Sequence, residues 1–255
     1  MGTVKNNTYF ISDVHFGHSG ILYYHPKRRE LAGITLKELQ TNKKEAVRKH
    51  DEWLINLWNN TIKKNDVVYF LGDFSWYNRA DTEKLLGKLH GKKFLIRGNH
   101  DKPLQGLERY FEWVGDIKEA KFNHDEYDFI DPNETFCVEM CHYPMLSWNR
   151  RQHGTVHAHG HTHGALDFLN RFPIMYALRH SAFIKRFVEI FFKVFPFLNR
   201  RELRVDVGLD GSLADYQFID IKKLYDYFCD IRSKAGFKTF GEYVEWIMGK
   251  QKFRM

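Results

Sequence analysis

Residues 66–73 read DVVYFLGD, an apolar run that ends in a glycine and a carboxylate. A strand that is apolar on both faces is typical of a buried parallel sheet. Two further β-rich runs lie on either side of it, at 8–12 and 93–96, and helical periodicity separates the three at 35–61 and 79–89. We expect the second helix to be closed by Gly91 as its C-cap. The order β-α-β-α-β predicts a parallel sheet with a polar side chain at the carboxyl end of each strand.

The second half of the chain has a different pattern. Short β-rich runs lie near 117–122, 127–130, 135–141, 155–159 and 203–208. Turn signals separate them, the clearest at 131–133. Residues 220–234 have the pattern of an amphipathic helix, and 240–248 are predicted to form a terminal helix. This order predicts an α/β fold, a four-layer α-β-β-α sandwich of two packed mixed sheets with flanking helices.

The composition sets limits without naming a function. The 255 residues include 39 Lys and Arg against 32 Asp and Glu, and the net charge of +7 suits an anionic partner such as phosphate, nucleic acid or acidic lipid. The polar start of the chain has no apolar signal region, and no apolar run is long enough to cross a membrane. Three cysteines without metal-site spacing predict free thiols in a reducing cytoplasm. We therefore expect a cytoplasmic protein.

Five short motifs place polar side chains after the predicted strands. They are Asp13-Val14-His15, Gly72-Asp73, Gly98-Asn99-His100-Asp101, Cys141-His142-Tyr143-Pro144 and Gly160-His161-Thr162-His163. Each is weak alone, but their order and spacing together specify a site for two metal ions. Carboxylate, amide and imidazole donors suit hard and borderline divalent ions. Two ions roughly 3.5–4 Å apart can hold the attacking and leaving oxygens of a phosphoryl transfer.

Two of the motifs carry candidate ligands at alternate positions. Asp13 and His15 are two residues apart, so in extended backbone both side chains project from the same side and can share one ion. His161 and His163 repeat this spacing with two imidazoles. Gly72 precedes a carboxylate at a strand end, where a glycine lets the backbone approach the site closely. The residue types and their spacing therefore indicate the type of reaction.

The chain resembles the calcineurin-like metallophosphoesterase superfamily. The superfamily pattern D-x-H, G-D, G-N-H-[DE], H, G-H-x-H is present in full and in order, and the resemblance covers about residues 9–210. The phrases FISDVHFGH at 10–18 and LGDF at 71–74 look like those of its small prokaryotic and phage-type members. The resemblance implies seven metal ligands. They are Asp13, His15 and His163 for a first ion, Asn99, His142 and His161 for a second, and Asp73 as the bridge between the two.

The resemblance also implies a mechanism. The two divalent ions would be Mn²⁺, with Fe, Zn, Ni or Co as alternatives, and a hydroxide bridging them would attack phosphorus in line. The physics agrees, because a bound cation lowers the pKa of water from 15.7 toward about 7. His100 would bind phosphate or protonate the leaving alkoxide. Asp101 would orient nearby side chains, and Arg97 is a candidate phosphate clamp because a guanidinium matches phosphate geometry.

One departure from the superfamily narrows the substrate. Its Ser/Thr protein phosphatases continue G-D-x-x-D-R-G, whereas here Asp73 is followed by FSWY at 74–77. The acidic partner of the catalytic histidine and the arginine after it are missing, so a protein phosphatase is a poor interpretation. We expect a metal-dependent phosphoesterase acting on a phosphodiester or nucleotide-like substrate. The alternatives are a peripheral-membrane hydrolase of a lipid-linked phosphate or pyrophosphate, and a non-catalytic scaffold, although scaffolds commonly lose ligands and all seven are present.

The remaining histidines are not assigned as metal ligands. His18 follows His15 by three residues and either lines the site or faces solvent. His157 and His159 continue an alternating pattern into the last motif, and we expect them to support the site structurally. His25 and the five other histidines are assigned to the surface or the core.

The predicted domain spans residues 1–220, with a basic, aromatic-rich helical insertion at about 167–201, and 221–255 form a C-terminal helical extension packed on it. Residues 171–204 hold eight basic and two acidic side chains, a net +6 of the chain's +7. Apolar residues of 183–195 cover one broad helical face. We expect a helical hairpin packed on the core or against a second subunit of a homo-oligomer. The alternative is a lid or membrane contact through 171–201. A nucleic-acid groove is the third alternative, but the sequence does not indicate it, because the aromatic residues do not alternate with basic ones.

Overall fold

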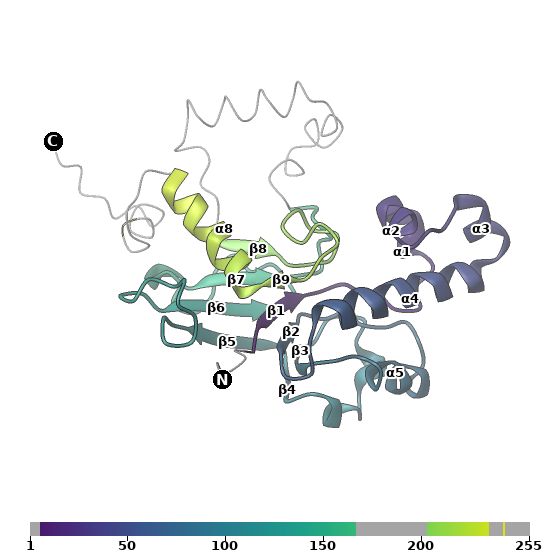
Figure 1. Cartoon of the computed structure of the whole chain (residues 1–255), viewed down its shortest axis with the longest axis horizontal. Helices are drawn as coiled ribbons and strands as arrows, with labels where there is room; N and C mark the ends of the chain where they lie inside the picture. Colours follow the sequence, from purple (N-terminus) through teal and green to yellow (C-terminus); the bar gives the residue numbers. More distant parts are fainter. Residues whose placement is uncertain (1–5, 167–202, 235–241, 243–255) are drawn as a thin grey trace, which may run out of the picture.

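Two sheets pack against each other in the computed structural model, which describes residues 6–166, 203–234 and 242 (Figure 1). The first sheet has the strand order β4-β3-β2-β1-β9. Its strands are β1 (Thr8–Ile11), β2 (Val67–Phe70), β3 (Lys92–Ile96), β4 (Trp113–Gly115) and β9 (Ile219–Asp220). Neighbours among β1 to β4 run parallel, and β9 runs antiparallel to β1. The predicted parallel β-α-β-α-β unit therefore forms the centre of this sheet.

The second sheet has the order β5-β6-β7-β8. Its strands are β5 (Ile117–Phe122), β6 (Phe136–Cys141), β7 (Val156–His159) and β8 (Arg204–Asp206). The pair β5 and β6 is antiparallel, and the other neighbours are parallel. Both sheets are thus mixed, and helices flank them, so the predicted α/β fold with two packed mixed sheets and flanking helices is confirmed.

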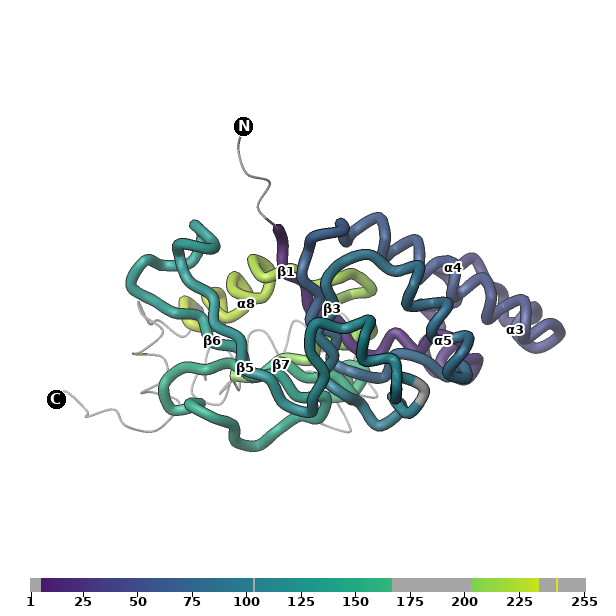
Figure 2. Tube along the Cα trace, turned by 90° about the horizontal axis from the view of Figure 1, so that it is seen from below, coloured from purple at the N-terminus to yellow at the C-terminus, as the bar shows by residue number. Residues whose placement is uncertain are grey.

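Alternation along the strands separates two apolar cores. Phe10 and Tyr69 are register partners, their rings stack with centroids 5.4 Å apart, and both belong to the core shared with the second sheet. Ile11 and Phe70 belong to the other core, which contains Trp58 of α4 (Lys43–Thr61) and apolar residues of α5 (Arg79–Leu86). Figure 2 shows β5, β6 and β7 on one side of β1, with α4 and α5 on the other. The first sheet is therefore covered on both faces.

Besides α4 and α5, the described residues form four more α-helices, three of them short. They are α1 (Ile21–Tyr24), α2 (Pro26–Leu31), α3 (Leu36–Thr41) and α8 (Ile221–Lys234). Phe228 of α8 packs near Phe136 of β6, with ring centroids 6.2 Å apart. Single 3-10 turns occupy Lys102–Leu104, Glu108–Tyr110 and Arg151–His153.

Several predicted boundaries need correction. The pattern at 35–61 forms two helices, because Asn42 leaves the helical region and its side chain accepts the N–H of Glu45 as the N-cap of α4. Helix α5 ends at Leu86 with Gly87 as its C-cap, and Gly91 instead has φ +86° in the turn before β3. Residues 127–130 form turns rather than a strand. Helices α1 and α2 and strands β4 and β9 were not predicted, since they are short.

The predicted insertion at 167–201 and the predicted helix at 240–248 lie outside the described residues, apart from residue 242. The division into a domain at 1–220 and an extension at 221–255 remains a prediction. The described part of that extension is α8, whose bounds agree closely with the predicted helix at 220–234.

Gly72 allows the loops after β2 and β3 to approach each other. Its φ is +91°, and a Cβ at this position would lie 2.5 Å from the amide nitrogen and 2.6 Å from the Cα of Gly98. These atoms belong to the backbone and cannot turn aside. We expect Gly72→Ala to lower the free energy of unfolding by about 2–5 kcal/mol, because overpacking adds to the cost of left-handed backbone. Urea denaturation measures this loss.

Gly33 is the matched control for this prediction. Its φ is +65°, but nothing lies within 4 Å of an added Cβ. Gly33→Ala should therefore lose only about 1–2 kcal/mol, the cost of the left-handed conformation alone. Equal losses in the two variants would show that the close approach at Gly72 is not a constraint on the fold.

Candidate metal centre

Strand ends from both sheets bring the predicted ligands together. The loops after β1, β2 and β3 supply residues from the first sheet, and those after β6 and β7 supply residues from the second. The seven are Asp13, His15, Asp73, Asn99, His142, His161 and His163. Backbone hydrogen bonds join these ends, because Asp13 N–H donates to Gly72 O and Gly160 N–H donates to His142 O. Parallel strands explain the convergence, since their carboxyl ends meet at one edge.

The backbone is left-handed at five of the predicted ligands. The φ angles are +57° at Asp13, +55° at His15, +60° at Asp73, +69° at His161 and +46° at His163. Such angles are uncommon for non-glycine residues, cost on the order of 1–3 kcal/mol each, and cluster at functional sites. The expectation of extended backbone at the alternate positions was therefore wrong. Tight turns direct these side chains, and His161 and His163 consequently point into different clusters.

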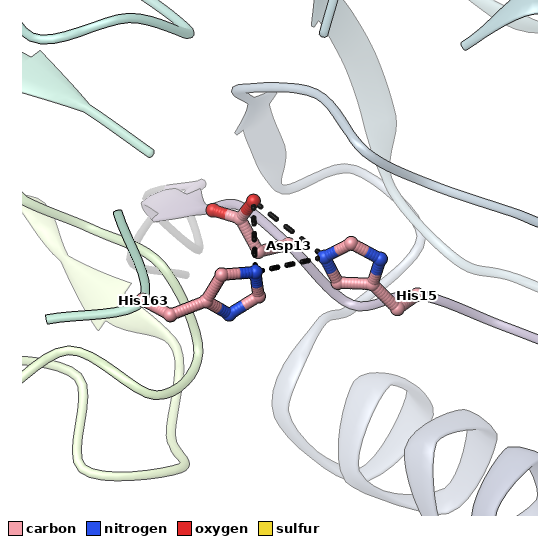
Figure 3. Close-up of side chains that lie close together, drawn as sticks. All are labelled: Asp13, His15 and His163. Atoms are coloured by element: carbon pink, nitrogen blue, oxygen red, sulfur yellow. Dashed lines mark hydrogen bonds and ion pairs between the residues drawn. The ribbon is translucent and has the colours of Figure 1, made fainter. Parts of the chain in front are cut away.

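The first cluster consists of Asp13, His15 and His163 (Figure 3). His15 Nε2 lies 3.2 Å from His163 Nε2 and 3.7 Å from Asp13 Oδ1. His163 Nε2 lies 3.9 Å from the same carboxylate oxygen. Two donors about 2.1 Å from a common ion are about 3.0–3.5 Å apart at usual coordination angles. The spacing in this cluster is thus close to that of a coordination site.

The second cluster consists of Asp73, His142 and His161. His142 Nε2 lies 3.7 Å from Asp73 Oδ1 and 3.1 Å from the side-chain oxygen of Asn99. The other carboxylate oxygen of Asp73 lies 4.0 Å from His15 Nε2, which belongs to the first cluster. Asp73 therefore stands between the two groups. The grouping of side chains matches the division that the family resemblance implied.

The donor set suits divalent cations. Asp13 is fully buried, and its Oδ1 has no hydrogen-bond partner among the described residues. An unpaired buried carboxylate oxygen is costly unless a cation balances it. His142 Nδ1 lies 2.7 Å from Leu71 O, which accepts its proton and leaves Nε2 unprotonated toward the cluster. Carboxylate, imidazole and amide donors are also those that Mn²⁺, Fe²⁺ and Zn²⁺ accept.

Burial and neighbouring charges perturb these groups in opposite directions. Burial would raise the pKa of Asp13, but its contact with His15 and the charge of His163 hold that pKa well below its usual range. Burial lowers the pKa of His15 to about 3, despite the opposing effect of Asp13. Burial raises the pKa of Asp73, and His142 partly opposes this. The clusters thus combine carboxylates with an unprotonated imidazole, the states that metal ligands need.

Members of both clusters line a cavity of about 280 Å³, namely His15 and His163 of the first and Asp73 and His161 of the second. Trp76 forms part of its wall between two imidazoles, with His18 stacked on its ring at a centroid distance of 4.0 Å and His100 at 4.1 Å. His100 is exposed, and its backbone N–H donates to Asp73 Oδ1 at 2.9 Å. His18 lines the cavity, which was one of its two predicted positions. His100 is thus placed at the mouth of the centre.

Asp101 and Arg97 lie outside the cavity lining. The buried carboxylate of Asp101 accepts backbone N–H groups from Asp73, Phe74 and Gly98 at 2.7–3.0 Å. It therefore orients backbone rather than side chains. Arg97 instead pairs with Asp116 at 2.8 Å on the surface. Its predicted role as a phosphate clamp remains a prediction without support from its position.

Sequence reasoning missed four residues at the centre. They are Trp76, His25, Arg28 and Asp210. Asp210 had a detectable signal, since it is a carboxylate shortly after a predicted strand, like the recognised ligands. Arg28 and His25 had none, because α2, which carries Arg28, and α1, which precedes His25, were not predicted. His157 and His159 are buried, and each places Nδ1 within 3.0 Å of a backbone carbonyl oxygen, as structural residues would.

Comparisons with known proteins found a matching family and several similar chains. A family profile described as calcineurin-like phosphoesterase matches residues 7–182. An uncharacterized protein of Methanocaldococcus jannaschii is 30% identical over 175 residues, 68% of this chain and 77% of the relative. The Gene 66 protein of Mycobacterium phage L5 is 28% identical over 184 residues, 63% of this chain and 79% of the relative. A crystal structure of an Aquifex aeolicus protein of unknown function covers 87% of this chain and 99% of its own, with 18% identity and a TM-score of 0.49.

The chain belongs to the calcineurin-like phosphoesterase family. In general terms it is a metal-dependent phosphoesterase, a hydrolase of phosphate esters. Within the described ranges, no helix combines the length and the apolar character needed to cross a bilayer.

The clusters predict that divalent metal stabilises the fold. An ion that binds only the folded state at 100 times its Kd adds about 2.7 kcal/mol, so Mn²⁺ should raise Tm by roughly 5–10 °C. Differential scanning fluorimetry with and without Mn²⁺ measures this shift. The double variant His15→Ala/His142→Ala loses one imidazole from each cluster and should show no shift. An unchanged Tm in the wild type at saturating Mn²⁺ would contradict the metal centre.

Proposed function

We propose that the protein is a two-metal phosphoesterase that hydrolyses phosphodiester or nucleotide-like substrates. The observation that carries the proposal is the pair of ligand clusters, each with a carboxylate and two imidazoles, with Asp73 between them. The family membership supports the reaction class. The complete ligand set favours an enzyme over a scaffold, since scaffolds commonly lose such ligands.

The predicted ligands form two sets, one for each ion. Asp13, His15 and His163 would hold the first ion, and Asn99, His142 and His161 would hold the second. Asp73, which lies between the two groups, would be a ligand shared by them. When bound, the two divalent ions supply a hydroxide nucleophile at neutral pH and neutralise charge on the phosphate oxygens. The left-handed turns hold the ligands in place before the substrate arrives, so little reorganisation accompanies the reaction.

His100 is the proposed group for contact with the substrate. It lies at the cavity beside Asp73 and Asn99, and its imidazole can donate a proton to the leaving alkoxide or a hydrogen bond to phosphate. In the ranges that the structure describes, no acidic side chain forms a hydrogen bond or ion pair with this ring, and the indole of Trp76 packs against it instead. This difference from the protein phosphatases supports small phosphate esters as substrates.

The proposal includes the identity of the metal and the cellular compartment. Mn²⁺ is the metal we favour, and the cytoplasm is the compartment, because the three cysteines are free thiols. Lid, membrane and oligomer roles of 167–201 concern residues outside those described. A hydrolysis panel with added Mn²⁺ tests the substrate class by comparing a generic diester, a monoester, cyclic nucleotides, RNA, DNA and lipid pyrophosphates. Preference for a lipid pyrophosphate would contradict the proposed class.

Asp73→Asn should abolish turnover and weaken the binding of both ions, because one carboxylate contacts both. Turnover of a chromogenic diester and the Mn²⁺ content after dialysis measure the two effects. Asp116→Asn, which changes an exposed carboxylate at the surface pair with Arg97, is the matched control and should behave like the wild type. A fully active Asp73→Asn variant with two ions would refute the bridge. Activity that survives exhaustive chelation would refute the metal mechanism itself.

His100→Ala should retain both ions but lose on the order of 10²–10⁴ in kcat, the usual effect of removing a general acid. The loss should shrink for a nitrophenolate leaving group, which needs no proton. Steady-state kinetics with a nitrophenyl and an alkyl ester measures both values. His153→Ala changes an exposed histidine in a 3-10 turn and serves as the control. Equal losses for the two leaving groups would show that His100 mainly binds phosphate.

A further inference from the structure

A third group of titratable side chains lies beside the first cluster. His25, His163 and Asp210 bring ligand-type atoms within 4.8 Å of one another, an arrangement that suits a metal ion. However, the guanidinium of Arg28 already covers Asp210. Arg28 Nε donates to Oδ1 at 2.7 Å, and its Nη2 donates to Oδ2 at 2.6 Å. Both carboxylate oxygens therefore face a buried cation, so the group has a role other than binding a third ion.

Arg28 joins this carboxylate to the turn that carries Asp13. Its side chain is completely buried, an unusual position for an arginine. Besides its two bonds to Asp210, Nη1 donates to Val14 O at 2.8 Å and Nη2 to Asp13 O at 2.6 Å. Asp13 is one of the residues with left-handed backbone. The guanidinium thus holds the carbonyl groups of a strained turn in one fixed position.

Asp210 connects the same guanidinium to a predicted ligand. His163 Nδ1 lies 2.7 Å from Asp210 Oδ2 and donates its proton to that oxygen. When His163 binds an ion, its other ring nitrogen, Nε2, is the unprotonated one, and this atom is directed toward Asp13 and His15. A carboxylate behind a ligating imidazole fixes the tautomer and orientation of the ring and raises its basicity as a ligand. Arg28 balances the charge of that carboxylate in a buried setting.

We propose that Arg28 and Asp210 are positioning residues for the first ion. They fix the Asp13–His15 turn through its carbonyl groups and His163 through its Nδ1 proton, so all three ligands of the first cluster depend on one guanidinium. The inference rests on the proposed two-metal function. Within the described part of the chain, neither Arg28 nor Asp210 forms a hydrogen bond or ion pair with Asp73, His142 or His161, so the second ion does not depend on them directly. The expected effect is therefore asymmetric between the two ions.

The asymmetry separates positioning from general stability. Asp210→Asn keeps the shape of the side chain and one acceptor oxygen, but it removes the charge behind His163. Changes behind a ligating imidazole usually weaken metal binding 10–100-fold. We expect Asp210→Asn to weaken the binding of one of the two ions by this factor and to leave the affinity for the other unchanged. Arg28→Met should do the same, with a larger loss of Tm because it also releases the turn at Asp13.

The experiment is a Mn²⁺ titration in which electron paramagnetic resonance detects the free ion. Wild type, Asp210→Asn and Arg28→Met are compared with Arg232→Met, which removes an ion pair with Glu134 elsewhere in the fold. Two backgrounds assign the affected ion. In His142→Ala, which disables the second cluster, Asp210→Asn should lower the affinity for the remaining ion. In His15→Ala, which disables the first cluster, Asp210→Asn should have no effect.

The outcomes of this titration test the proposed function and the inference separately. A wild type that binds no Mn²⁺ overturns the proposed function and this inference with it. A wild type that binds two ions, with folded Asp210→Asn binding both equally well, overturns the inference alone. Equal weakening of both ions, or failure of the near-isosteric Asp210→Asn to fold, would also overturn it, because the pair would then be a general stability element. Circular dichroism establishes folding before each titration.

Discussion

The structure of the centre depends on buried carboxylates that have too few protein partners. Asp13 is fully buried with one oxygen unpaired, and Asp73 lies between two imidazole clusters. Desolvated carboxylates are unfavourable unless positive charge compensates them. Arg28 supplies that charge for Asp210, but among the described residues Asp13 and Asp73 have only histidines as ion-pair partners. Two divalent cations would remove the deficit, and the same cations would perform the chemistry of the family.

The fold meets this electrostatic demand by joining two sheets at their strand ends. Parallel strands of both sheets end at one edge, and tight turns with positive φ direct the side chains inward. Glycines next to the ligands permit the approach, since a Cβ at Gly160 would meet the side chains of Ser12 and Asp13. Hydrogen bonds offset the strain in these turns: Asp101 accepts the N–H of Asp73, and Arg28 donates to the carbonyl oxygen of Asp13. Neither residue needs to touch the substrate.

Local patterns predicted most of the fold, because apolar strands and their terminal motifs are signals within a short window. They failed where contacts between residues distant in sequence determine the local structure. Asn42 interrupts one helical pattern by its own capping bond, and short β4 pairs with β3 through contacts that no local pattern reveals. The ligand motifs were visible in sequence, but the left-handed backbone was not. Arg28 was invisible for the same reason, since only folding brings it to Asp210, 182 positions away.

The most direct test of the account is a crystal structure with Mn²⁺, in which anomalous scattering locates the ions. The account predicts two peaks roughly 3.5–4 Å apart, with an oxygen of Asp73 near each. One should lie among Asp13, His15 and His163, and the other beside His142. A single peak, or a peak between His25 and Asp210 in place of either ion, would contradict the two-metal centre.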